Sequence, residues 1–219
     1  MSNIKENIKE IEQQLAHSQV KIIAVTKYYG VDRLVEAYDE GLRNFGENKV
    51  VDAITKIESL SQKIRDDSIF HLIGHLQSNK VKKAVKYFDV IHSVDSLKLA
   101  QKIDLEAKSL NKRQKILLQV NYAKEESKTG FSVEELFKAY AEMRKLENIK
   151  IEGLMTMAPK SMSEDGLYAL FDGVKKIKFE LNSKYEDSME ELSMGMSQDY
   201  LVAIKCGSTM IRLGKKIFD

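Results

Sequence analysis

Short apolar runs alternate along the chain with longer stretches of helical periodicity. Runs rich in β-branched and other apolar residues predict eight strands, at residues 22–26, 44–47, 70–74, 90–94, 115–120, 149–157, 191–195 and 209–214. Between them, apolar residues recur at the i, i+3, i+4 and i+7 spacing of an amphipathic helix, for example over residues 31–38. The same kind of spacing over residues 4–15 predicts an extra helix before the first strand.

Strands that alternate with helices indicate βαβ units and a parallel sheet. The eight predicted units show no break in composition, so they favour a single α/β domain over residues 1–219, a (β/α)8 TIM barrel. A doubly wound sheet is the alternative fold. Such a sheet normally carries a phosphate-binding loop after its first strand, and residues 26–30, TKYYG, do not resemble one.

Composition and charge exclude several classes of protein. The chain has 219 residues, 43% of them hydrophobic, and a net charge of only +2, which predicts no nucleic-acid partner. Cys206 is the only cysteine, so an internal disulfide is impossible. The amino terminus is not a signal peptide, and no apolar run is long enough to span a bilayer. We therefore expect a cytoplasmic protein without a membrane partner.

Polar residues and glycines concentrate where the predicted strands end. In a (β/α)8 barrel the active site forms at the carboxyl ends of the strands. Lys27 follows the first strand, and His75 follows the third without a second histidine at metal-binding spacing, so we expect no metal site. The other polar residues, methionines and glycines at these ends are Glu47, Asn48, Ser93, Asp95, Asn121, Met155, Met157, Ser193, Gly195, Met196, Ser197, Arg212 and Gly214.

Two kinds of chemistry are suggested by these ends. A lysine that is partly desolvated in a barrel mouth becomes a nucleophilic amine, able to form a Schiff base, although a strand-end lysine more often extends to the surface. The loops after strands seven and eight often bind phosphate, here through main-chain N–H groups near Gly195 and Gly214 and the hydroxyl of Ser193 or Ser197. Together they suggest a phosphorylated carbonyl ligand, either pyridoxal 5′-phosphate (PLP) or the sugar phosphate of a Schiff-base aldolase.

Several motifs resemble one known family. HLIGHLQSNKVKK, NFGENKV, EESKTGF, GLMTMAP, LSMGMSQDYLVAI and GSTMIRLGKKIF are similar to motifs of the pyridoxal phosphate homeostasis proteins, which are related to the amino-terminal barrel of alanine racemase. The resemblance covers residues 22–218. It departs from the family where KYYG lacks a proline after the lysine and where Lys215 replaces a small residue.

The resemblance implies a barrel of the alanine racemase type that holds PLP as an internal aldimine of Lys27. It also implies that Asn48 lines the site, that Ser197 and the main chain around Gly214 hold the phosphate, and that Arg212 lies beside the ring nitrogen or the phosphate. An arginine at the ring nitrogen would keep it unprotonated and weaken the ring as an electron sink. The full predicted cofactor-binding set is Lys27, Asn48, His75, Ser193, Met196, Ser197, Arg212, Gly214 and Lys215.

Three functions remain open. The resemblance favours a PLP-binding protein of intracellular PLP homeostasis, without established catalysis, whose partners include PLP and possibly PLP-dependent apo-enzymes. A racemase-type PLP enzyme is the alternative, but related racemases carry a second domain that supplies a catalytic tyrosine, and this chain ends at Asp219. We therefore expect no catalytic residue and a monomer. A cofactor-free lysine aldolase is the third possibility.

Overall fold

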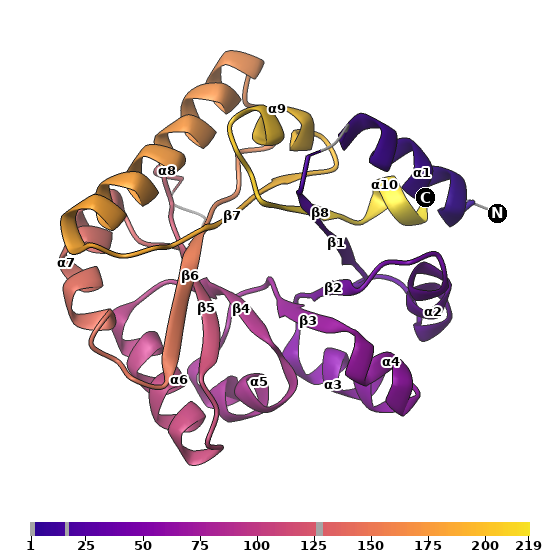
Figure 1. Ribbon diagram of the computed structural model, residues 1–219, viewed down its shortest axis with the longest axis horizontal. Coiled ribbons are helices and arrows are strands. Elements are labelled where there is room, and N and C mark those ends of the chain that lie inside the picture. Colours follow the sequence, from indigo (N-terminus) through magenta and orange to yellow (C-terminus); the bar gives the residue numbers. More distant parts are fainter. Residues whose placement is uncertain (1–2, 16–17, 126–128) are drawn as a thin grey trace.

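Eight parallel strands form a closed barrel in the computed structural model, which describes residues 3–15, 18–125 and 129–219 (Figure 1). The strands pair in chain order, and β8 closes the ring against β1 with Ala24 opposite Leu213. The predicted (β/α)8 barrel is therefore confirmed. Residues 126–128 of the EESKTGF motif lie outside the described residues. The strands are β1 (Lys21–Val25), β2 (Asn44–Glu47), β3 (Ile69–Leu72), β4 (Val90–Val94), β5 (Gln114–Gln119), β6 (Ile149–Met155), β7 (Glu191–Met196) and β8 (Met210–Leu213).

Helices connect the strands and surround the barrel. Ser132 and Glu135 form a capping box before the helix that begins at Val133, with the Ser132 hydroxyl accepting from the Glu135 N–H and the Glu135 carboxylate accepting from the Ser132 N–H. No helix among the described residues is long and apolar enough to cross a membrane. The helices are α1 (Ile4–Leu15), α2 (Val31–Asp39), α3 (Val50–Ser59), α4 (Gln62–Asp67), η1 (Ser78–Lys80), α5 (Val81–Tyr87), α6 (Leu97–Ser109), α7 (Val133–Met143), α8 (Glu164–Tyr185), α9 (Tyr200–Lys205) and α10 (Lys215–Phe218).

The predicted amino-terminal helix is α1, which lies beside the carboxyl-terminal α10 (Figure 1). Its apolar stripe, Ile4, Ile8, Ile11 and Leu15, is buried as the periodicity predicts. The side-chain amide of Asn7 donates to the carbonyl oxygen of Ile217 at 3.0 Å, and Lys216 forms an ion pair with Glu10 at 2.7 Å. The first helix therefore fixes α10, which directly follows the last strand.

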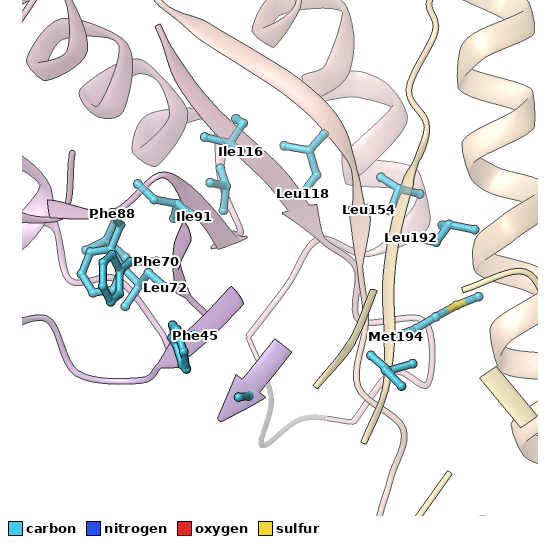
Figure 2. Close-up of a cluster of buried hydrophobic side chains, with 14 of the residues drawn as sticks. Phe45, Phe70, Leu72, Phe88, Ile91, Ile116, Leu118, Leu154, Leu192 and Met194 are labelled. Carbon is cyan, nitrogen blue, oxygen red and sulfur yellow. The ribbon is translucent and has the colours of Figure 1, made fainter. Parts of the chain in front are cut away.

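Two apolar layers fill the molecule. Outward-facing strand residues pack against the helices, and Figure 2 shows part of this layer, including Phe45, Leu118 and Met194. A second cluster contains Ile23, Leu117, Met155 and Met210. Because β1 and β5 lie on opposite sides of the ring, their side chains meet only across its interior. The alternation of the strands therefore separates an outer core from a barrel interior.

Several strands end earlier than the sequence predicts. β1 ends at Val25 rather than Thr26, β6 ends at Met155 rather than Met157, and β8 ends before Gly214. After β1 the chain turns at once, because the N–H of Tyr29 donates to the carbonyl oxygen of Thr26 at 3.0 Å. The candidate residues at these positions consequently lie on loops at the carboxyl mouth of the barrel.

Candidate functional site

Lys27 lies on the loop after β1, at the mouth where a barrel places its active site. Its side chain is exposed, as is common for a lysine at a strand end. Its Nζ lies 4.8 Å from the centre of the exposed Tyr28 ring.

A buried ion pair fixes the chain immediately before Lys27. The Glu47 carboxylate, at the end of β2, accepts from Nζ of Lys56 at 2.5 Å and from the hydroxyl of Thr26 at 2.7 Å. Lys56, on α3, also donates to the carbonyl oxygen of Thr26 at 2.7 Å. The hydroxyl and the carbonyl oxygen of Thr26 are therefore both hydrogen-bonded, which anchors the turn that carries Lys27.

Asn48 and His75 follow β2 and β3 on the same rim. Asn48 is partly buried, and the backbone of Gly74 approaches it so closely that a Cβ on Gly74 would lie 2.2 Å from the Asn48 carbonyl oxygen. A glycine is therefore required at position 74. The exposed His75 lies with Nδ1 3.3 Å from Oδ2 of Asp95, the residue after β4. These contacts tie neighbouring loops of the mouth together.

The end of β7 forms a tight turn before α9. Gly195 has φ +96°, and the following N–H of Met196 donates to the Asp199 carboxylate at 2.5 Å. The N–H of Asp199 donates back to the carbonyl oxygen of Met196 at 3.0 Å. Ser197 lies between them and is only partly buried. Ser197 therefore lies at the rim, and its contact with an anion stays a prediction.

Gly214 connects β8 to α10 and lies beside the end of β1. A Cβ placed on Gly214 would lie 3.4 Å from the carbonyl oxygen of Val25. Lys215, the first residue of α10, is exposed. The first N–H groups of a helix have no acceptor within the helix, so this short helix presents donors next to the Lys27 loop.

Arg212, by contrast, is buried inside the barrel. Its guanidinium donates to the carbonyl oxygen and the hydroxyl of Ser193, both at 2.7 Å, and to the carbonyl oxygen of Thr156 at 2.9 Å. Burial lowers the pKa of Arg212 to about 10, while the Asp199 carboxylate acts in the opposite direction. The prediction that Ser193 is an anion contact at the rim needs correction. Ser193 is fully buried, and its hydroxyl is used by Arg212 and His92.

The sequence pattern did not predict the buried polar residues that support this arginine. His71 in β3 and His92 in β4 lie in the barrel interior, and Asn44 of β2 contacts His71. A signal was present in the sequence, because each histidine interrupts an apolar strand. The interior contacts between strands distant in the chain could not be predicted from that signal alone.

Comparisons with known proteins agree with this architecture. The family model for the alanine racemase N-terminal domain matches residues 1–218. A pyridoxal phosphate homeostasis protein of Synechocystis is 42% identical over 199 residues, which cover 91% of this chain and 90% of that protein. A second protein of that name, from Vibrio alginolyticus, is 33% identical over 100% of this chain and 97% of its own length.

Solved structures show the same fold. PipY of Synechococcus elongatus without PLP superimposes with a TM-score of 0.94 at 38% identity, covering 99% of this chain and 100% of PipY. PipY with PLP bound gives a TM-score of 0.91 at 37% identity, with the same coverage. An alanine racemase of Clostridium difficile, 18% identical, shares the fold over 98% of this chain and 56% of its own, with a TM-score of 0.80. The chain therefore belongs to the pyridoxal phosphate homeostasis proteins, within the family of the alanine racemase N-terminal domain.

Proposed function

We propose that this protein binds PLP reversibly, with Lys27 as the point of covalent attachment, and takes part in PLP homeostasis. One observation carries the proposal. The Lys27 loop and the first turn of α10 come from the adjacent strands β1 and β8 and meet at the carboxyl mouth. These two neighbouring segments thus carry an amine and main-chain donors suited to a phosphate. The relative PipY, with 37% identity, has been solved with PLP bound.

The residues at this mouth fit PLP chemically. When bound, PLP supplies an aldehyde, which condenses with a primary amine, and a phosphate, which needs hydrogen-bond donors and positive charge. Lys27 supplies the amine. In our proposal the Ser197 hydroxyl and the N–H groups at Gly214 and Lys215 hold the phosphate, as helix-start amides commonly do. Arg212 lies deeper and contacts the ring, while Asn48, His75 and Met196 line the rim.

We propose binding and release of PLP rather than catalysis as the role of this site. An exposed Lys27 leaves the covalent bond accessible to water and to a competing amine, which favours exchange. Racemisation would require a second acid–base group on the opposite face of the cofactor. Exchange of the α-proton of alanine at enzymatic rates would instead support the racemase-type alternative.

We further propose that the protein acts as a cytoplasmic monomer and exchanges PLP with PLP-dependent apo-enzymes. Transfer can be followed by the activity that an apo-enzyme gains when the PLP-loaded protein is added. The apo-enzyme should gain activity faster with the PLP-loaded wild-type protein than with the Lys27→Ala protein at the same total concentration of PLP. Sedimentation of the loaded protein at the mass of two chains would overturn the monomer proposal.

Absorption spectroscopy tests the attachment site. Purified protein titrated with PLP should develop the yellow band of a PLP Schiff base, and Lys27→Ala should abolish it. Lys49→Ala is the matched control, because Lys49 is another exposed lysine at the same mouth, after β2. Borohydride reduction followed by peptide mapping identifies the modified lysine directly. A colourless wild-type protein would overturn PLP binding, whereas a band retained in Lys27→Ala would overturn only the assignment to Lys27.

A further inference from the structure

A chain of buried hydrogen bonds crosses the interior of the barrel and ends on Arg212. Nε2 of His71 lies 3.0 Å from Oδ1 of Asn44, and Nδ1 of His71 lies 2.9 Å from Nε2 of His92. Nδ1 of His92 lies 2.9 Å from the hydroxyl oxygen of Ser193, which accepts from Arg212 at 2.7 Å. Five side chains are thus linked end to end.

The chain runs through the barrel rather than along its wall. His92 belongs to β4 and Ser193 to β7, and these strands are not neighbours in the ring, so their side chains meet across the interior. His71, His92, Ser193 and Arg212 are all at least 96% buried. At the other end, Asn44 lines a cavity of about 260 Å³ that it shares with Lys21 and Met210. The hydrogen bonds therefore connect this cavity to the arginine of the proposed site.

Arg212 sets the direction of every hydrogen bond in the chain. A guanidinium only donates, so the Ser193 hydroxyl oxygen accepts from it and directs its own proton to Nδ1 of His92. His92 must then carry its proton on Nε2 and donate it to Nδ1 of His71. His71 in turn carries its proton on Nε2 and donates to Asn44. Both rings are neutral in this arrangement.

The opposite direction is disfavoured by one unpaired group. If His92 donated through Nδ1, the Ser193 hydroxyl oxygen would accept from both His92 and Arg212. Its own proton would then have no acceptor among the residues that the structure describes. Leaving a buried donor unpaired is costly. Burial also lowers the pKa of His71 to about 3 and that of His92 well below its usual value, in agreement with neutral rings.

The directed chain also explains how a buried cation is tolerated. The recorded acceptors of Arg212 are two carbonyl oxygens and one hydroxyl oxygen rather than carboxylates. Ser193, His92 and His71 each turn their accepting atom toward Arg212 and donate their own proton away from it. Aligned hydrogen bonds polarise one another, so His92 and His71 increase the negative potential at the Ser193 oxygen.

We propose that His92 and His71 are positioning residues for Arg212, acting through Ser193 and ending at Asn44. The proposal rests on the proposed function, which places Arg212 beside the PLP ring. The chain holds one edge of the guanidinium against Ser193 and Thr156. It thereby fixes the direction in which the remaining N–H groups point, without touching the cofactor.

The first test uses the protein without PLP. The sequence contains four histidines, so long-range nitrogen–proton NMR spectra of the rings are readily assigned with single-histidine variants. We expect His71 and His92 to be neutral, each with its proton on Nε2, at neutral pH. Ser193→Ala should shift the Nδ1 resonance of His92 by removing its donor. A proton on Nδ1 of either ring, or a charged ring, would overturn the proposal.

The second test uses PLP binding. His92→Phe keeps a planar ring but removes both hydrogen-bonding atoms, and we expect it to weaken PLP binding roughly tenfold and to shift the absorption band. Borohydride reduction should still label Lys27 in this variant. His92→Gln, which can accept and donate, should recover part of the affinity. Met210→Leu is the control, because Met210 lies in the interior but outside the chain of hydrogen bonds.

The outcomes separate the two proposals. Wild-type protein that binds no PLP would overturn the proposed function, while the NMR test would still decide the direction of the chain. Binding and absorption by His92→Phe that equal those of the wild type would overturn the positioning role. If His92→Phe does not fold, Ser193→Ala decides by the same measurements, because it removes only one oxygen atom.

Discussion

Oε1 of Glu47 lies 2.5 Å from Nζ of Lys56, and the same oxygen accepts from the Thr26 hydroxyl at 2.7 Å. The Glu47 side chain is 4% exposed and that of Lys56 is 13% exposed, so this ion pair is largely shielded from water. It links the ends of β1 and β2 with α3 one residue before Lys27. The proposed attachment site therefore stands on a rigid support, although the Lys27 side chain itself is exposed.

Removing the cation of this pair should strongly destabilise the protein. Lys56→Met leaves the buried Glu47 carboxylate without its partner, and we expect the free energy of unfolding in urea to fall by about 3–5 kcal/mol. Lys138→Met is the control, because the Lys138–Glu134 pair on α7 is exposed on both sides. The unfolding midpoint of Lys138→Met in urea should equal that of the wild-type protein. Equal stabilities of the two variants would show that the Glu47–Lys56 pair has no structural role.

A matched pair of glycine substitutions separates backbone strain from steric contact at the mouth. Gly195 and Gly41 have nearly the same φ, +96° and +99°. A Cβ at Gly195 would lie 2.8 Å from the Cβ of Ala203, whereas one at Gly41 would meet nothing within 4 Å. Both alanine variants should lose about 1–3 kcal/mol of stability from strain, and Gly195→Ala should lose more. Thermal unfolding measures the difference, and a larger loss for Gly41→Ala would contradict the contact.

The fold was predictable because its signals are local. Each strand is an apolar run of a few residues, and each connecting helix repeats its apolar positions over several turns, so the order of elements follows directly. The exact strand ends were less predictable. With Pro159 the only proline, the turns depend on hydrogen bonds such as Tyr29 N–H to Thr26, which the sequence pattern does not specify.

The candidate site was predictable only in part, for a geometric reason. Residues at strand ends can be assigned to the mouth without knowledge of the register, as Lys27 and Ser197 were. Ser193 could not be assigned in this way, because whether it lies at the rim or in the interior depends on where β7 pairs with its neighbours. Its contact with His92, 101 residues earlier in the chain, exists only after the barrel has closed.

Cys206 should react slowly with thiol reagents in the native protein. It lies at the end of α9, before the turn at Gly207, on the side of the barrel away from the mouth, and it is 6% exposed. Burial raises the pKa of its thiol, so less of the reactive thiolate is present at neutral pH. Labelling in denaturant should be at least roughly tenfold faster than in buffer. PLP should leave the native rate unchanged, and protection by PLP would contradict this placement of the cofactor.

The buried histidines should make stability depend on pH in a defined direction. The pKa of His71 is about 3 in the folded protein, and the pKa of His92 is also well below its usual value, in both cases chiefly through burial. In the unfolded chain both titrate near about 6.5. Between these values the unfolded state binds more protons than the folded state, so the free energy of unfolding falls as the pH falls. The stabilisation is fully present above about pH 6.5 and is progressively lost below it.

The size of this effect can be measured by removing one ring. Each histidine should contribute a slope of about 1.4 kcal/mol per pH unit between about pH 4.5 and 5.5. His92→Gln should therefore lower the slope of the unfolding free energy by about that amount, because glutamine does not titrate there. Urea unfolding at several pH values across this window gives both slopes, and carboxylates contribute equally to the two proteins. Parallel slopes would mean that His92 is already protonated in the folded barrel, and the directed hydrogen bonds to Ser193 and Arg212 would then be excluded.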